Sequence, residues 1–390
     1  MKSAGPIRAE KKTKAPKLSR YSALAREVNS SFDPNRVFVD ITTSNDVNPS
    51  VRVVDLFSGA GGMSQGLRQA GFVIDTAVEL VEIAAETHRR NFPESSVVCG
   101  DIKDYVPKRH QGAKRIRLVV GGPPCQGFSV AGRRDPSDPR NRLFREFVRV
   151  VEILQPDYFV MENVPGILTM QNGAVKDAIL EAFEEIGYSN TSVAILEAAS
   201  FGVAQLRSRA IFIGNRHGLP NPFPAPLLEP SEYLPIETAF TNLPDWERIP
   251  EINHEWTRHS KSFTERISRV TPGGSLYETF MDAYKRQYQG VPSMTIKENH
   301  GGTHIHPTLD RCISAREMAR LQSFPDNFVF AGPMKKAMWQ IGNAVPPLLA
   351  EAIGRALAPF LEAIIEKRQP IFQEILPDTS TSDDKQLRLL

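Results

Sequence analysis

Between residues 51 and 215 the chain alternates short β-branched runs with longer segments of helical periodicity, and this alternation constrains the fold more than any other feature. Seven runs have the length and composition of strands, at 51–57, 73–79, 97–101, 118–120, 158–161, 193–196 and 211–213. Between them apolar residues recur at helical spacing, as in Leu143, Phe147, Val151 and Leu154, and Pro156 ends that helix. Strands joined by helical crossovers form a parallel sheet with both faces covered. We therefore predict an α/β fold built on a doubly wound sheet.

After Gly214 the regular alternation stops. Eight prolines interrupt the next stretch, at positions 220, 222, 224, 226, 230, 235, 244 and 250, and such spacing is incompatible with long helices or central strands. Helical patterning returns over 344–365. We therefore predict a sheet domain over 49–218, a smaller irregular domain over 219–333, and a helical segment over 334–369 that completes the sheet domain.

Both ends of the chain are predicted to lie outside these domains. Residues 1–48 bury little and carry a cluster of basic side chains: Lys11, Lys12, Lys14, Lys17 and Arg20. We interpret this stretch as a flexible basic extension, either a solvated tail or an arm for nucleic acid. Residues 370–390 are polar and read as a frayed tail.

The composition narrows the class of protein. The hydrophobic fraction is 41%, the charged fraction is 24% and the net charge is only +2, so affinity for nucleic acid must come from local basic patches. No apolar run approaches the roughly 20 residues that span a bilayer, and the N-terminus lacks an apolar signal core. The three cysteines, Cys99, Cys125 and Cys312, are far apart, which disfavours disulfides and a zinc site and suits the cytoplasm.

The ends of the first three predicted strands carry residues suited to a ligand, because ligands of open α/β sheets bind at the carboxyl ends of the strands. The first strand runs into a glycine turn, Phe57-Ser58-Gly59-Ala60-Gly61-Gly62, where a ligand can approach the backbone closely. Glu79 ends the second strand and can accept both hydroxyls of a ribose, and Asp101 ends the third and can accept from an adenine amino group. A dinucleotide turn would need glycine where Ser64 stands. The pattern favours an adenosine-containing ligand without phosphates.

Cys125 is the candidate nucleophile. It follows the fourth strand in Gly121-Gly122-Pro123-Pro124-Cys125-Gln126-Gly127, between a rigid Pro-Pro step and a flexible glycine segment, so we expect it to be displayed at a strand end. A nearby cation or helix N-terminus would favour the reactive thiolate. Cys99 and Cys312 fall within strand and helix patterns and are interpreted as structural.

Six ordered blocks of the sequence, spread over about residues 50 to 365, resemble those of the DNA (cytosine-5) methyltransferases. Residues 55–62 resemble the cofactor turn of that family, Pro123-Pro124-Cys125-Gln126 its nucleophile block, and Glu162-Asn163-Val164 its proton-donor block. Gln205-Leu206-Arg207-Ser208-Arg209 is similar to its Q-x-R-x-R block, and residues 316–326 and 340–347 resemble its last two.

This resemblance implies a fold, a cofactor and a reaction. The fold is the Rossmann-like one of methyltransferases that use S-adenosyl-L-methionine, and the irregular domain takes the place of a target-recognition domain. The reaction is methyl transfer to carbon 5 of a cytosine flipped out of double-stranded DNA. Cys125 would add to C6 of the base, Glu162 would hold N3 and the exocyclic amine, Arg209 would bind the base oxygen, and Arg207 would brace the loop.

The resemblance also implies two sets of binding residues. The cofactor set is Phe57, Ser58, Gly59, Gly61, Gly62, Glu79, Asp101, Ile102, Pro123, Asn343 and Val345. The DNA set is Ser129, Arg133 and Arg134, in a loop over 129–141 expected to close on phosphates, and Thr295, Thr303 and His304 in the smaller domain. No metal is expected, although His300, His304 and His306 lie close in sequence. The compact length suits a monomeric prokaryotic enzyme without an obligate protein partner or membrane contact, paired with a restriction endonuclease.

Three alternatives are less consistent with the sequence. A transfer-RNA methyltransferase of the same fold would carry a Cys-Phe-Thr tripeptide, which does not occur here. A non-catalytic DNA-binding regulator would have lost the nucleophile block, and Ser64 disfavours an oxidoreductase that uses NAD. The DNA sequence that the chain recognises cannot be predicted, because it depends on the conformation of loops in the variable domain.

Overall fold

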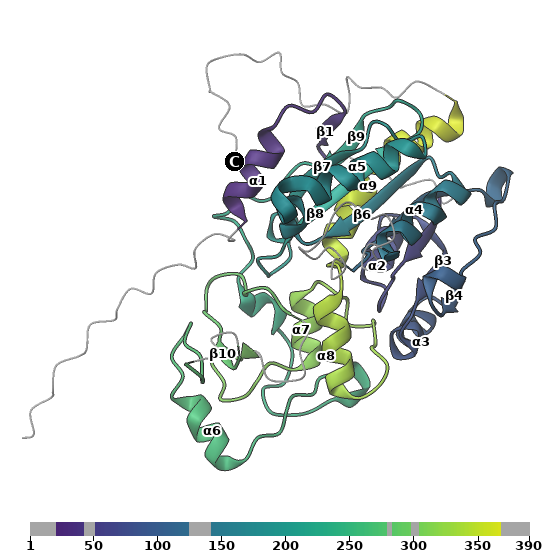
Figure 1. Ribbon diagram of the computed structural model, residues 1–390. Coiled ribbons are helices and arrows are strands. Elements are labelled where there is room, and N and C mark those ends of the chain that lie inside the picture. Colours follow the sequence, from purple (N-terminus) through teal and green to yellow (C-terminus); the bar gives the residue numbers. More distant parts are fainter. Residues whose placement is uncertain (1–20, 43–50, 125–141, 279–282, 298–303, 368–390) are drawn as a thin grey trace, which may run out of the picture.

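The computed structural model describes residues 21–42, 51–124, 142–278, 283–297 and 304–367 (Figure 1). Its centre is a seven-stranded sheet with the strand order β4-β3-β2-β5-β6-β8-β7. The strands are β2 (Arg52–Leu56), β3 (Val73–Glu79), β4 (Ser96–Cys99), β5 (Ile116–Gly121), β6 (Tyr158–Asn163), β7 (Ser192–Glu197) and β8 (Ser208–Asn215). The sequence-based prediction of an α/β, doubly wound sheet is confirmed.

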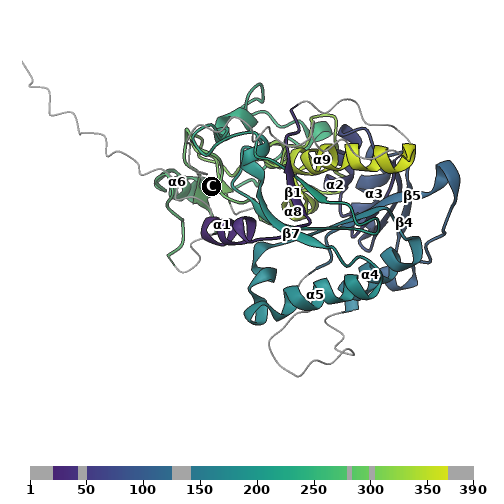
Figure 2. The ribbon, with the colours of Figure 1, turned by 90° about the horizontal axis from the view of Figure 1, so that it is seen from above.

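Helices cover both faces of this sheet (Figure 2). On one face lie α2 (Gly62–Gln69) and α9 (Pro347–Glu366), whose Leu67 and Leu357 are buried in one apolar core. The two helices approach closely at Gly66, where a Cβ atom would lie 2.1 Å from the carbonyl oxygen of Pro347. The other face is covered by α4 (Arg142–Leu154) and α5 (Ala174–Glu185), and α3 (Glu82–Asn91) connects β3 to β4.

The sheet differs from the predicted all-parallel one at β8. This strand is antiparallel to both of its neighbours, β6 and β7. The reason lies in the connection from β7 to β8, which contains only a short 3-10 turn, Ala198–Phe201, rather than a crossover helix. A chain that turns back without a crossover must run antiparallel to the strand it has just left.

The predicted flexible extension over 1–48 is wrong for its second half. Residues 21–42 form α1 (Ser22–Ser30) and β1 (Arg36–Val39), and β1 pairs with β9 (Asn221–Pro224). Helix α1 lies against β7, which is an edge strand of the sheet, and Asn29 both accepts from the amide of Ile195 and donates to its carbonyl oxygen, each at 2.9 Å. The side chain of Arg36 donates to the carbonyl oxygen of Val193 at 2.7 Å. Side chains of the N-terminal segment therefore satisfy backbone groups of the sheet edge.

A smaller, irregular lobe lies at the carboxyl end of the sheet (Figure 1). Its elements are α6 (Lys261–Ser268), β10 (Lys285–Arg286), β11 (His304–Ile305), α7 (Ala315–Leu321) and α8 (Met334–Asn343). The boundaries differ from those predicted at both ends. Strand β9, inside 219–333, pairs with β1 beside the sheet domain, whereas α8, placed after that range, packs against α7 of the small lobe.

The segment 334–369 therefore holds two helices rather than one, and only α9 lies along the sheet. In the ranges that the structure describes, no helix is long and apolar enough to cross a membrane.

Candidate active site

The strand register places the predicted functional positions in one row. Leu56 of β2 pairs with Val78 of β3 on one side and Gly121 of β5 on the other, and Gly121 pairs with Met161 of β6. The next residue of each strand is therefore Glu79, Phe57, Gly122 or Glu162. Neighbouring strands are about 4.8 Å apart, so a glycine turn, a candidate cofactor carboxylate and a candidate catalytic carboxylate lie side by side at the carboxyl ends of the strands. We call the ends of β2, β3 and β4 the cofactor edge, and the ends of β5 and β6, with Arg209 of β8, the catalytic edge.

The glycine turn after β2 has an unusual backbone. Phe57 has a φ of 57° and Gly61 one of 96°, both in the left-handed region, which is costly for a side chain such as that of Phe57. The hydroxyl of Ser58 is buried and has no hydrogen-bond partner among the described residues. At Gly59 no atom of the described segments would lie within 4 Å of a Cβ atom, so within these segments the turn faces open space. A buried polar group without a partner beside open space is what a ligand site presents.

Glu79 holds this turn in place. Its Oε2 accepts from the amide of Gly59 and its Oε1 from the amide of Val81, each at 2.8 Å. Burial raises the pKa of Glu79, and the two amide donors act in the opposite direction. Each carboxylate oxygen can accept a second hydrogen bond, so Glu79 has the capacity to bind ligand hydroxyls while it holds the turn.

The neighbouring strand end supplies a second carboxylate and apolar surface. Asp101 caps the 3-10 turn Ile102–Asp104 through the amide of Lys103 at 3.0 Å and pairs with Nζ of Lys103 at 2.9 Å, and its side chain is 35% exposed. Ile102 is buried. Leu80, which our reading of the sequence did not select, is 66% exposed directly after Glu79. An exposed leucine next to a strand-end carboxylate offers a flat ligand an apolar contact, and its position after that acid was the signal that could have identified it.

The turn between α8 and α9 closes the other side of this region. Asn343 is the exposed last residue of α8, and the carbonyl oxygen of Val345 would lie only 2.3 Å from a Cβ atom at Gly62. The glycine at position 62 is therefore required by the close approach of the two segments. The structure describes all of the predicted cofactor residues. The contact between Val345 and Gly62 brings the 343–345 turn next to the glycine turn, whereas Pro123 belongs to the neighbouring catalytic edge.

The catalytic edge contains an ion pair between two predicted residues. Nε of Arg209, on β8, lies 2.6 Å from Oε1 of Glu162, on β6, and both side chains are largely buried, with 11% and 13% exposure. Nη1 of Arg209 donates to the carbonyl oxygen of Ser208 at 2.8 Å. Among the described residues Nη2 has no acceptor, so Arg209 retains a donor for an incoming group.

The segment that leads into Cys125 lies beside this ion pair. At Gly122 a Cβ atom would be 2.8 Å from Oε2 of Glu162, and Nδ2 of Asn163 donates to the carbonyl oxygen of Pro123 at 3.0 Å. The described chain continues to Pro124. Cys125, Ser129, Arg133, Arg134 and Thr303 lie outside the described residues.

Arg207 does not face the ion pair as a catalytic group would. Its guanidinium is buried and donates to three carbonyl oxygens, those of Ile296 at 2.7 Å, Gly342 at 3.0 Å and Ala344 at 2.9 Å. Burial lowers the pKa of Arg207, and the charge of Arg209 acts in the same direction. Arg207 therefore joins β8, the small lobe and the α8–α9 turn, and these hydrogen bonds support a bracing role for it.

Two of the predicted DNA-reading residues have structural contacts. His304 is 4% exposed and its Nδ1 lies 2.7 Å from Nε2 of Gln287, so its burial contradicts the prediction that it contacts DNA bases. The hydroxyl of Thr295 donates to the carbonyl oxygen of Leu206 at 2.7 Å and ties the small lobe to the Q-x-R-x-R segment. Within the described ranges, no three His, Cys, Asp or Glu residues are grouped so that they could hold a metal ion.

Our reading of the sequence also missed a row of buried, hydrogen-bonded polar side chains beneath the glycine turn. Oγ of Ser64 donates to Oδ2 of Asp55 at 2.6 Å and lies 3.1 Å from Nε2 of His88. Burial raises the pKa of Asp55 to about 7 and lowers that of His88 to about 3. His88 and Phe92 lie against Gly61, where a Cβ atom would be within 2.9 Å of both rings. These residues support the turn from below.

Comparisons with known proteins agree with this geometry. Residues 51–358 match the family model of the C-5 cytosine-specific DNA methylases. The chain is 41% identical over 326 residues to the type II methyltransferase M1.HphI of Haemophilus parahaemolyticus, covering 79% of this chain and 87% of that protein. It is 35% identical over 380 residues to M.DdeI of Desulfomicrobium norvegicum, covering 80% and 90%.

Solved structures show the same relationship. A crystal structure described as a DNA modification methyltransferase encoded within an E. coli prophage has a TM-score of 0.65 and 28% identity, covering 80% of this chain and 99% of that one. The Dnmt2 methyltransferase of S. pombe shares the fold, with a TM-score of 0.53 at 20% identity, covering 80% and 99%. Because the family model matches most of the chain, and because the candidate site lies at the strand ends, the chain belongs to the C-5 cytosine-specific DNA methylase family and is a DNA (cytosine-5) methyltransferase.

Proposed function

We propose that this enzyme uses S-adenosyl-L-methionine to methylate a cytosine that is flipped out of a specific double-stranded DNA sequence, through a covalent adduct with Cys125. The observation that carries the proposal is the Glu162–Arg209 ion pair beside Pro123 and Pro124, which lead directly into Cys125. A charged pair with little solvent exposure is suited to binding the polar edge of a single base.

The residues at the cofactor edge fit S-adenosyl-L-methionine. Glu79 would accept from the ribose hydroxyls, Asp101 from the adenine amino group, and Leu80 and Ile102 would contact the adenine ring. The unpartnered hydroxyl of Ser58 and the open face of Gly59 leave room for the amino-acid part. When bound, this cofactor supplies an electrophilic methyl group to C5 of the cytosine.

The chain's own residues would activate the base. The thiolate of Cys125 forms a bond to C6, and the electron pair of the C5–C6 double bond then becomes available at C5. Glu162 holds the N3 edge and the 4-amino group, while the free Nη2 donor of Arg209 binds the O2 oxygen and stabilises the negative charge that develops on the ring. After methylation, loss of the C5 proton restores the double bond and the bond between C6 and the sulfur of Cys125 breaks.

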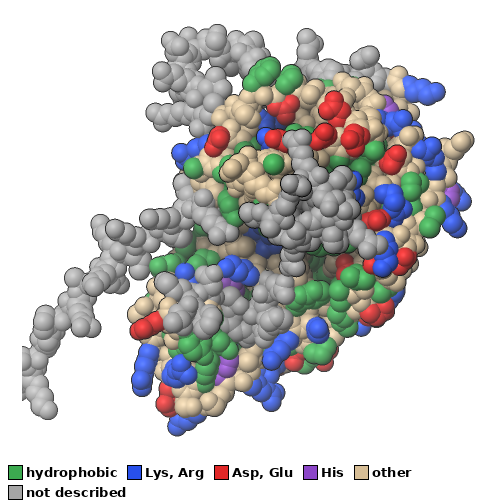
Figure 3. All heavy atoms as spheres, viewed as in Figure 1, with side chains coloured by type: hydrophobic (Ala, Val, Ile, Leu, Met, Phe, Trp, Pro, Cys, Tyr) green, Lys and Arg blue, Asp and Glu red, His purple; other side chains and the backbone are tan. Residues whose placement is uncertain are grey.

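DNA would lie where the two lobes meet. Exposed basic side chains of the small lobe include Arg258, Lys261, Arg266, Arg269 and Lys297, and Figure 3 shows Lys and Arg side chains along the surface of that lobe. We propose that such charges, with Arg133 and Arg134 of the 129–141 segment, bind phosphates without selecting a sequence. Base selection would come from loops of the small lobe, Thr303 among them, in an enzyme that acts as a monomer and modifies DNA for a restriction system.

Bisulfite sequencing of DNA from a host that expresses the chain tests the reaction and identifies the target sequence. A duplex with 5-fluorocytosine at that target then tests the adduct, because fluorine cannot leave C5 as a proton does. We expect a denaturant-stable complex with the wild-type enzyme and none with Cys125→Ser, which should still bind S-adenosylhomocysteine with near wild-type affinity. Methylation at C5 without a trapped complex would refute the covalent step and leave the family activity intact.

A further inference from the structure

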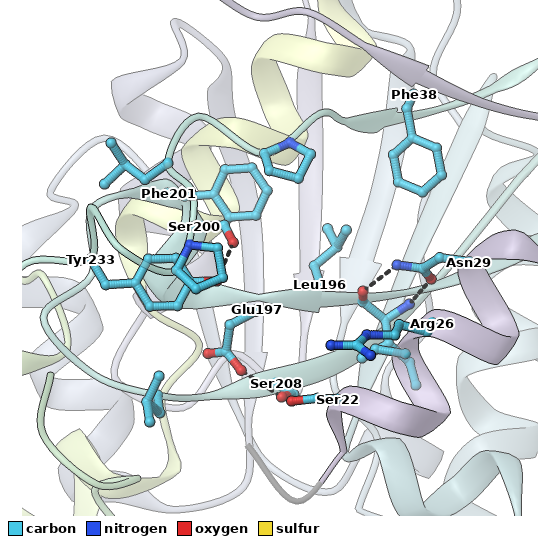
Figure 4. Close-up of a pocket in the computed structure, with 16 residues that line it drawn as sticks. Ser22, Arg26, Asn29, Phe38, Leu196, Glu197, Ser200, Phe201, Ser208 and Tyr233 are labelled. Carbon is cyan, nitrogen blue, oxygen red and sulfur yellow. Dashed lines mark hydrogen bonds between the residues drawn. The ribbon is translucent and has the colours of Figure 1, made fainter. Parts of the chain in front are cut away.

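A cavity of about 140 Å³ lies between α1 and the carboxyl end of β7 (Figure 4). Its walls come from α1, from β7 with the following 3-10 turn, and from the loop over 226–233. Helix α1 precedes the 51–358 region that matches the family model. One wall of the cavity is therefore supplied by a segment outside the region that matches the family model.

Glu197 is the carboxylate that lines this cavity. Its Oε1 accepts from the backbone amide of Arg207 at 2.5 Å and its Oε2 from the hydroxyl of Ser208 at 2.6 Å. Both donors are neutral, and among the described residues Glu197 forms no ion pair; Arg209, whose charge acts on it, is paired with Glu162. Burial raises the pKa of Glu197, and hydrogen bonds from Ser208 and from the amides of Arg207 and Ala199, together with the charge of Arg209, act in the opposite direction. A carboxylate withdrawn from water in this way is stabilised by a cation placed next to it.

The rest of the lining is mainly apolar. Phe38, Leu196 and Phe201 point toward the cavity in Figure 4, and Leu206 and Pro226 add to the same surface. At the far side the hydroxyls of Ser200 and Tyr233 are 2.9 Å apart and satisfy each other. A cavity of similar volume in an apolar protein core holds a single benzene ring, so the apolar part of a ligand here is limited to about one ring.

We propose that this cavity binds a small amine that carries one aromatic or aliphatic ring, with the ammonium group on Glu197 and the ring against Phe38 and Phe201. An anion would be repelled by Glu197, and a neutral ring compound would leave its charge without a partner. The bound amine would lie next to Arg207 and Ser208, at the start of the strand that carries Arg209. The site is separate from the cofactor edge, which is built from β2, β3 and β4.

Benzylamine and its neutral analogue benzyl alcohol test the proposal. Saturation-transfer NMR or calorimetry would measure their affinities for the full chain, with saturating S-adenosylhomocysteine present so that amines cannot occupy the carboxylates of the cofactor edge. We expect benzylamine to bind at least tenfold more tightly than benzyl alcohol. Glu197→Gln keeps one acceptor oxygen for the amide of Arg207, and its NH2 group can donate to the hydroxyl of Ser208. It should abolish that preference while benzyl alcohol still binds.

Two further variants locate the probe. Ala25→Phe places a ring in the cavity from α1 and should reduce binding of both compounds at least tenfold. Arg26 lines the cavity from the same helix with the opposite charge, so Arg26→Gln should leave benzylamine binding at least as strong as in the wild type. Equal binding of the two compounds by the wild type, or a preference that survives Glu197→Gln, would overturn the proposal, as would insensitivity to Ala25→Phe. Thermal unfolding confirms that each variant is folded.

Discussion

The guanidinium of Arg207 donates to the carbonyl oxygen of Ile296 across 2.7 Å, although the two residues belong to different lobes. Its other terminal nitrogen donates to the carbonyl oxygens of Gly342, at the end of α8, and Ala344, next to the Val345 that abuts the glycine turn at Gly62. Gln205 reinforces the junction, because its amide nitrogen donates to Leu321 and its oxygen accepts from the amide of Ile296. One buried junction therefore fixes the small lobe relative to both edges of the site.

We expect Arg207→Lys to weaken cofactor and DNA binding together. Lysine keeps the charge but cannot reach three carbonyl oxygens with the geometry of a guanidinium, and each buried acceptor left without a donor costs about 1–3 kcal/mol. The melting temperature should fall, and the affinity for S-adenosylhomocysteine should drop at least tenfold.

Arg209→Lys is the matched control, since Arg209 contacts Glu162 and not the cofactor side. It should lower turnover strongly and leave S-adenosylhomocysteine affinity within about twofold of wild type, a factor worth about 0.4 kcal/mol. Calorimetric titration measures the affinity of both variants for S-adenosylhomocysteine. If Arg207→Lys spares cofactor affinity, the junction does not organise the cofactor edge.

Gly122→Ala should impair catalysis without unfolding the protein. The new Cβ atom would lie 2.8 Å from Oε2 of Glu162, so the end of that side chain must move, whereas the backbone need not. A displacement of this size at a reacting group costs about a hundredfold in rate. We therefore expect kcat to fall by that order with little change in melting temperature.

Gly166→Ala, in the 3-10 turn that follows β6, provides a comparison, because its nearest neighbour would be the hydroxyl of Tyr21 at an ordinary 3.7 Å. It should behave like the wild type in single-turnover methylation. Equal losses in the two variants would mean that the effect comes from the general loss of glycine flexibility and not from Glu162.

The parts of the fold that follow from local pattern were predicted well. Strands such as 73–79 combine β-branched residues with turn signals, and β3 has those same bounds. Pro156 marked the end of α4 at Leu154 because proline cannot continue a helix. Glu79, Glu162 and Arg209 were selected from strand ends and from family blocks, and strand register then brought each to the expected edge.

Features that depend on distant partners were not predicted. Asn29 and Arg36 form hydrogen bonds with backbone groups of β7, although they are more than 150 residues away in sequence. No local pattern in residues 21–42 predicts these hydrogen bonds. His304 read as a polar loop residue, yet its ring is buried against Gln287. The antiparallel β8 depends on whether the connection after β7 folds as a short turn or a crossover helix, which is decided by packing.

The buried chain of Asp55, Ser64 and His88 predicts opposite pH effects for two variants. The pKa of Asp55 is raised from 3.8 to about 7, so the folded protein keeps this proton and loses stability as pH rises from about 4 to about 7. Asp55→Asn has no proton to lose and should gain relative to wild type over that range. A shift of about three units corresponds to at most about 4 kcal/mol.

The pKa of His88 is lowered from 6.5 to about 3, so the folded protein keeps the ring neutral and loses stability as pH falls from about 6.5 toward 3. His88→Gln removes this pH-dependent loss of stability, so the difference in unfolding free energy between wild type and His88→Gln should shrink at low pH. Denaturant unfolding of the three proteins between pH 4 and 8 measures both trends. Parallel pH dependence of the two variants would show that these groups do not titrate as their burial requires.

Exchange of the small lobe should change which DNA sequence is methylated and keep the reaction. Glu79, Asp101, Glu162 and Arg209 all come from the sheet domain, and base contacts worth about 1–3 kcal/mol each must come from loops long enough to reach a groove. The junction around Arg207 sets the exchange points: the graft should keep the 293–296 segment, whose contacts with 204–207 hold the lobes together.

Within the native lobe, Thr303→Ala should weaken binding to the target site alone, whereas Arg133→Ala should weaken target and random DNA alike and lessen the salt dependence. Bisulfite sequencing of the chimaera, with salt titrations of the two variants, separates these roles. A chimaera that methylates the original sequence, or an Arg133→Ala enzyme with altered preference, would refute the division.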